Sequence, residues 1–130
     1  MPKPMPFSTA VNVQPARRNQ IDAAWTLEAL QTVWERQRDR VGERIDTIER
    51  TIAVLSENRL DDELRHEAER AAHMLAGSVG MFGFIDASRL ARELERELAY
   101  ALPDRAAALA ALAQDLRDGL QGEVTLCAQR

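Results

Sequence analysis

The chain contains little cysteine and no long apolar run. Its single cysteine, Cys127, excludes an internal disulfide and offers no ligand spacing for a cysteine-bound metal. No apolar stretch reaches the roughly 18 residues of a membrane-spanning helix. The first residues also lack the apolar core of a secretory signal. We therefore expect a cytoplasmic protein that has no membrane segment.

Aromatic residues are also scarce, at 5% of the chain, whereas Leu, Ala, Arg and Glu are plentiful. This balance favours helices with aliphatic seams over pleated sheets and predicts an all-α protein. The net charge is −4 and the basic residues are interspersed with acidic ones, so the chain lacks the basic face that nucleic-acid binding requires. With 130 residues, 45% of them hydrophobic, we expect one domain.

Apolar periodicity predicts four long helices. Their seams are Val41, Ile45, Ile48, Ile52 and Leu55; Leu64, Ala68, Ala71, Leu75, Val79 and Phe82; Ala87, Leu90, Leu94, Leu98 and Ala101; and Leu109, Leu112, Ala113, Leu116 and Leu120. Asp61 or Asp62 can cap the second of these helices and Asp86 or Ser88 the third, and Gly83 is a natural stop between them. Short connections favour an antiparallel up-down four-helix bundle.

The N-terminal part of the chain differs in composition. Residues 1–20 hold four of the five prolines and predict a flexible arm. An additional short N-terminal helix is expected from Ile21, and its Trp25 and Trp34 are large enough to cover one end of the bundle. The expected boundaries are an arm over 1–20, the bundle over 21–125 and a tail over 126–130.

One histidine, His73, lies away from the apolar stripe of its helix when residues are placed about 100° apart. The same outward strip contains His66, Glu69, Ala76, Gly77 and Gly80. Each interior glycine costs a helix roughly 1 kcal/mol relative to alanine, and the chain accepts this cost twice beside His73. Small residues there would let a large partner surface reach the imidazole, so the strip indicates a histidine presented to a protein.

The residues around His73 form a motif. It spans His73-x-x-x-Gly-Ser-x-Gly and then Phe82-Gly-Phe, with Leu94-Glu95 on the next helix. This pattern resembles the histidine-containing phosphotransfer (HPt) domain of two-component phosphorelays, and it is especially similar to the phosphotransfer domains of chemotaxis-type histidine kinases. The motif covers about a quarter of the chain, and the four-helix pattern extends the match over most of the rest.

The resemblance implies that His73 is phosphorylated on an imidazole nitrogen, that Gly77 admits the partner and that Glu95 orients the ring. The family usually carries lysine three residues after the histidine, where this chain has Ala76. Another cation substitutes, with Arg70 and Arg92 the nearest by helical position, or phosphoryl handling is weaker than usual, or transfer has been lost. The expected phosphoryl-binding and partner-binding residues are Glu69, Arg70, Ala76, Gly77, Gly80 and Arg92.

The chain has no glycine-rich nucleotide-binding motif, so we expect no kinase activity of its own. The resemblance implies transfer between His73 and a partner, which is a histidine kinase holding ATP or the receiver aspartate of a response regulator. Any Mg²⁺ would belong to that receiver, and we expect a monomer with no bound cofactor. Glu63-x-x-His66 superficially matches a di-iron motif, but His66 falls on the solvent side, so we expect no metal.

Two other functions remain open. A degenerate HPt-like adaptor would bind a kinase or receiver and regulate it without phosphotransfer, and Ala76 is the feature that motivates it. A generic helical scaffold would bind no receiver at all. Glu95, likewise, could be only an exposed helix charge that pairs with nearby arginines.

Overall fold

The computed structural model describes residues 15–122 and 124, with side chains from Thr26 onward. This part of the chain contains helices and no strand. The elements are α2 (Pro15–Ser56), α3 (Asp62–Met81), α4 (Ile85–Leu98), the 3-10 turn η1 (Pro103–Arg105) and α5 (Ala106–Gly119). The predicted all-α class and the four-helix bundle are therefore confirmed.

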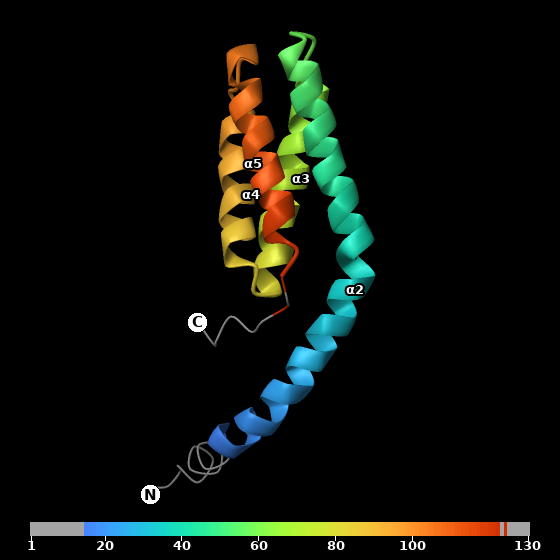
Figure 1. The fold of residues 1–130 in the computed structure, drawn as a ribbon, viewed down its shortest axis with the longest axis vertical. Helices are drawn as coiled ribbons and strands as arrows, with labels where there is room; N and C mark the ends of the chain where they lie inside the picture. The colour runs from blue at the N-terminus through green and yellow to red at the C-terminus, as the bar shows by residue number, and fades with distance from the viewer. Residues whose placement is uncertain (1–14, 123, 125–130) are drawn as a thin grey trace, which may run out of the picture.

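The helices alternate in direction, as short connections require (Figure 1). Each helix contacts two neighbours, in the order α2, α3, α4, α5 and back to α2. Asp61 starts α3 as predicted, because its carboxylate accepts a 2.8 Å hydrogen bond from the backbone N–H of Leu64. Gly83, with a positive φ of 89°, makes the turn between α3 and α4.

The core lies along the bundle axis, where the aliphatic seams of the four helices meet. Its fully buried large side chains include Ile45, Ile48, Leu55, Leu75, Leu94, Leu98, Leu109 and Leu116. Burying one such side chain contributes about 1.5–3 kcal/mol, so these seams supply the main driving force for folding. The predicted seam residue Leu90 is only partly buried and packs against the core from its edge.

The N-terminal part of the bundle differs from the sequence-based expectation. Within the described residues, the segment from Ile21 does not form a short helix of its own, because residues 15–56 form the continuous α2. The N-terminal part of α2 extends past the end of the other three helices (Figure 1). Residues 15–20 of the expected arm belong to α2, whereas residues 1–14 and the expected tail at 126–130 lie outside the described residues.

Aromatic side chains close the end of the bundle at the α3–α4 connection. The ring of Trp34 lies 5.2 Å from that of Phe82 and 4.9 Å from that of Phe84, measured between ring centroids. All three side chains are buried, as the sequence predicts for Trp34 and Phe82. The side chain of Trp25 lies outside the described residues.

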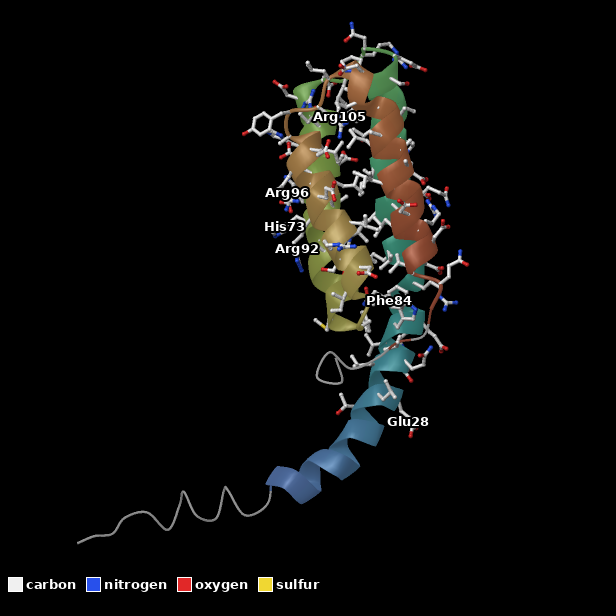
Figure 2. The ribbon with its side chains drawn as sticks, turned by 60° about the vertical axis from the view of Figure 1, so that its left-hand side comes forward. Glu28, His73, Phe84, Arg92, Arg96 and Arg105 are labelled. Carbon is white, nitrogen blue, oxygen red and sulfur yellow. The ribbon has the colours of Figure 1, made fainter. Side chains whose placement is uncertain are left out.

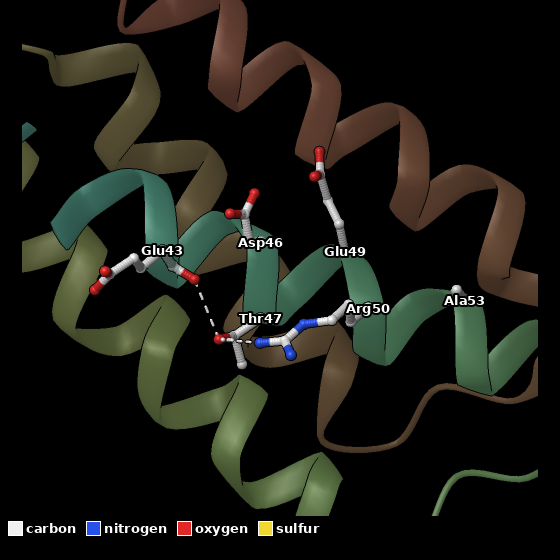
Figure 3. A pocket seen from close by; sticks show the side chains of 6 residues that line it. All are labelled: Glu43, Asp46, Thr47, Glu49, Arg50 and Ala53. Atoms are coloured by element: carbon white, nitrogen blue, oxygen red, sulfur yellow. Dashed lines mark hydrogen bonds between the residues drawn. The ribbon is translucent and has the colours of Figure 1, made fainter. Parts of the chain in front are cut away.

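A polar contact joins α5 to the outer face of α2. Arg117 donates hydrogen bonds to Asp46 at 2.9 Å and Glu49 at 2.8 Å. Both carboxylates line an open hollow on α2 and point toward α5 (Figure 3). The hydrogen bond that Arg117 donates to Glu49, and after it the one to Asp46, raises the pKa of Arg117 above its usual value, although partial burial opposes the shift. Arg117 therefore stays charged at physiological pH, so its contacts with both carboxylates are ion pairs.

Candidate functional site

His73 lies near the middle of α3 and presents its ring to solvent (Figure 2). Its side chain is 73% exposed, and its Nδ1 atom lies 3.1 Å from Oε2 of Glu95 on α4. The side chain of Glu95 is 34% exposed. The structure therefore brings together the histidine and the carboxylate that the sequence pairs.

The partner of Nδ1 decides which ring nitrogen can react. An ionised carboxylate only accepts hydrogen bonds, so the Glu95 contact requires Nδ1 to carry the proton. A neutral imidazole has one protonated nitrogen, and Nε2 then holds the lone pair. The arrangement can thus use Nε2 as a nucleophile while Glu95 keeps the ring in one tautomer and one orientation.

Next to His73, the surface of α3 has no side chain at Gly77. Gly77 lies one turn further along the helix, and a Cβ atom added there would meet no heavy atom within 4 Å. Met74 and Met81 are exposed large hydrophobic side chains of the same helix. The surface around Gly77 therefore leaves open space next to the ring.

Helical stepping predicts that Ala76 and Gly80 lie on the outward strip with His73. In the structure, both positions lie against α4 instead. Ala76 is buried, with 7% exposure. A Cβ atom added to Gly80 would lie 3.1 Å from Oγ of Ser88 on α4. The placement of Ala76 toward solvent is therefore wrong, because α4 packs over that flank of α3, and Gly80 is small because the two helices approach closely there.

A buried polar link crosses this same contact between α3 and α4. Ser88 is 1% exposed, and its hydroxyl donates a 2.7 Å hydrogen bond to the backbone oxygen of Ala76. The Ser88 oxygen in turn accepts a 2.9 Å hydrogen bond from Nη2 of Arg92.

The predicted cap of α4 is wrong. Neither Asp86 nor Ser88 caps α4, which has Phe84 at its N-cap and no side-chain cap. The link from Ser88 to Ala76 and Arg92 was not predicted, because the sequence shows only a polar residue one turn before Arg92.

The remaining predicted residues lie around this centre. Oε1 of Glu69 is 3.4 Å from Nδ1 of His66, so Glu69 pairs with the other histidine and not with His73. Arg70 is exposed and makes no ion pair with any residue that the structure describes. Arg92 and Arg96 both lie on the α4 side of His73 (Figure 2), and Arg96 was not predicted.

Within 15–122 and 124, no group of three or more His, Cys, Asp or Glu side chains could hold a metal ion. No helix in the same part of the chain is long and apolar enough to span a membrane.

The fold and the site define an antiparallel four-helix bundle that presents to solvent an imidazole in contact with a carboxylate. The family model described as "Hpt domain" matches residues 15–127, and the chain therefore belongs to the HPt domain family. No curated protein and no solved structure gives a significant match. Membership places the chain in the histidine phosphotransfer of phosphorelays, as a phosphotransfer module rather than an independent kinase, and the family interacts with kinases and receiver domains.

Proposed function

We propose that this domain relays a phosphoryl group through Nε2 of His73, exchanging it with the aspartate of a response-regulator receiver or accepting it from a histidine kinase. The observation that carries the proposal is the 3.1 Å contact between Nδ1 of His73 and Glu95, on a side chain that is 73% exposed. This contact supports a ring with its proton on Nδ1, which leaves the Nε2 lone pair for the reaction.

Transfer from a receiver then follows in one step. The Nε2 lone pair attacks phosphorus, the N–P bond forms, and the bond from phosphorus to the aspartyl oxygen breaks, so that its electron pair leaves with the carboxylate. The ring gains positive charge, and the Nδ1 proton stays in the hydrogen bond to Glu95, whose negative charge stabilises the product. The reverse step returns the phosphoryl group to aspartate. Positioning and electrostatics supply most of the rate, as in other phosphoryl transfers.

The partner surface follows from the same geometry. Gly77 is the open position beside the ring, and we assign to it the admission of the partner. Arg70 and Arg92 are the two cations proposed to face the phosphoryl group, and Glu69 lies at the edge of the docking surface beside His66. Ala76 and Gly80 support this surface indirectly, because their small size lets α4 pack close to α3. Any Mg²⁺ in the exchange would be held by the receiver.

The test uses a receiver that carries a radiolabelled aspartyl phosphate. We expect the label to move to the domain in an acid-labile, base-stable form and to be lost in His73→Gln. His66→Gln is the matched control, because His66 lies on the same helix, is 74% exposed and also has a carboxylate beside Nδ1. Label that persists in His73→Gln excludes the proposed acceptor. A receiver complex that forms without any transfer would establish the adaptor function instead.

A further inference from the structure

We propose that Arg92, held in place by the buried hydroxyl of Ser88, is the cation that stabilises the phosphoryl group on His73, and that Ser88 is its positioning residue. This inference rests on the phosphotransfer proposed above. The two positions that follow His73 by one turn of α3 are Ala76 and Gly77, and neither carries a positive charge. The inference assigns that missing cation to α4.

The antiparallel pairing of α3 and α4 places Arg92 opposite Ala76. Glu95 reaches His73, and Ser88 contacts Gly80, so residue numbers fall on α4 as they rise on α3. Ala76 lies between the two α3 positions, and Arg92 lies between the two α4 positions. The Ser88 hydroxyl joins this middle pair, because it bonds both the Ala76 carbonyl and the Arg92 guanidinium.

This register keeps the guanidinium close to the reacting nitrogen along the helix. Three residues of α-helix rise about 4.5 Å, so Arg92 is held beside a point one turn from His73. On α4, Arg92 and Glu95 are three residues apart and share a face. The same face of α4 therefore carries a carboxylate at Nδ1 and, one turn away, a guanidinium anchored to Ser88.

Anchoring distinguishes Arg92 from the other nearby cations. A guanidinium has five N–H donors, and the bond to Ser88 uses one of them, so the others remain for an anion. Arg70 makes no ion pair or side-chain hydrogen bond within the described part of the chain, so it would lose side-chain entropy when a phosphoryl group orders it. Arg92 has lost part of that freedom already, because a buried hydroxyl fixes its end.

The experiment compares single-turnover transfer from a phosphorylated receiver in Arg92→Gln, Ser88→Ala and the matched control Arg89→Gln, since Arg89 is an exposed arginine of the same helix that pairs with Asp86. We expect a decrease in the rate constant of about tenfold or more for Arg92→Gln, a smaller decrease for Ser88→Ala, and less than about twofold for Arg89→Gln. Receiver affinity should change little, because the missing contact forms only with the phosphoryl group.

Two further measurements separate this role from a structural one. Adding Ala76→Lys to either Arg92→Gln or Ser88→Ala should restore the rate, since a lysine stem can carry its ammonium to the same surface. In ³¹P NMR of the protein phosphorylated with phosphoramidate, the phosphoryl group should titrate at higher pH in Arg92→Gln than in the unaltered protein, because a nearby cation favours the more negative form.

The outcomes are distinguishable. An Arg92→Gln protein that transfers within twofold of the unaltered rate, or an unmoved ³¹P titration, overturns the role of Arg92 and leaves the relay intact. A Ser88→Ala rate that Ala76→Lys fails to restore overturns the positioning role of Ser88. An unaltered protein that takes no label from receiver or phosphoramidate overturns both the relay and this inference.

Discussion

Gly77 allows stability and function to be changed in opposite directions at one position. It lies inside α3, four residues from the C-terminal end of that helix, and a Cβ atom there would meet nothing within 4 Å. Substitution by alanine therefore creates no clash inside the bundle. Substitution by glutamine adds a long polar side chain directly beside His73, on the surface that a receiver must approach.

The expected gain in stability comes from helix propensity alone. Replacing an unstrained interior glycine by alanine adds about 1 kcal/mol to the free energy of unfolding, and glutamine adds somewhat less. For a domain of this size, 1 kcal/mol corresponds to a rise in Tm of about 4 °C. Thermal unfolding followed by circular dichroism measures it.

The expected loss of transfer comes from sterics. Reacting atoms must approach to about 3–3.5 Å, and a displacement of about 1 Å can cost a hundredfold in rate. We expect Gly77→Gln to transfer about 100-fold more slowly from a phosphorylated receiver, in single-turnover assays. Gly42→Ala on α2 is the matched control, because its added Cβ also meets nothing within 4 Å, and it should raise Tm without changing transfer. A Gly77→Gln protein that transfers at the unaltered rate would refute the role of the small-residue surface.

Three further changes test separate parts of the structure. Glu95→Gln should slow phosphoryl transfer about tenfold with little change in Tm, because the amide cannot balance the charge that the ring acquires; an unchanged rate would limit Glu95 to a surface charge. Gly80→Ala should lower the free energy of unfolding in urea titrations, because the new Cβ would lie 3.1 Å from a Ser88 hydroxyl that two hydrogen bonds hold in place; a stabilised protein would contradict the close packing. Arg117→Ala should cost about 1 kcal/mol at low salt and less at high salt, because Arg117 bridges two carboxylates of α2 at the surface; a loss independent of salt would show that packing dominates.

The sequence predicts those features that depend on local pattern. Apolar periodicity locates the four helices, and Asp61 and Gly83 mark a helix start and a turn because their chemistry acts on adjacent backbone. The pairing of Glu95 with His73 follows from the family motif together with the helical position of Glu95 on the flank of its own stripe. The helix positions, the cap and the turn need no knowledge of how the helices pack, whereas the family motif carries the Glu95 pairing between two helices.

The features that fail depend on packing between helices. Stepping around α3 gives the angle of Ala76 from the centre of one stripe, but α3 contacts both α2 and α4, so its buried surface is wider than that stripe. The same cause hides the link from Ser88 to Ala76, which exists only when α4 lies against α3. The continuous α2 was missed because the residues between the two apolar segments are polar, and a helix that extends past its bundle needs no seam there.

The position of phosphorus on the imidazole provides the sharpest test of the proposed relay. Protein labelled with ¹⁵N-histidine and phosphorylated by a receiver can be studied by NMR, which identifies both the histidine and the ring nitrogen that carry phosphorus. The contact between Nδ1 and Glu95 predicts one product, phosphorylated on Nε2 of His73. Phosphorus on Nδ1, or on His66, would contradict the arrangement proposed for the site.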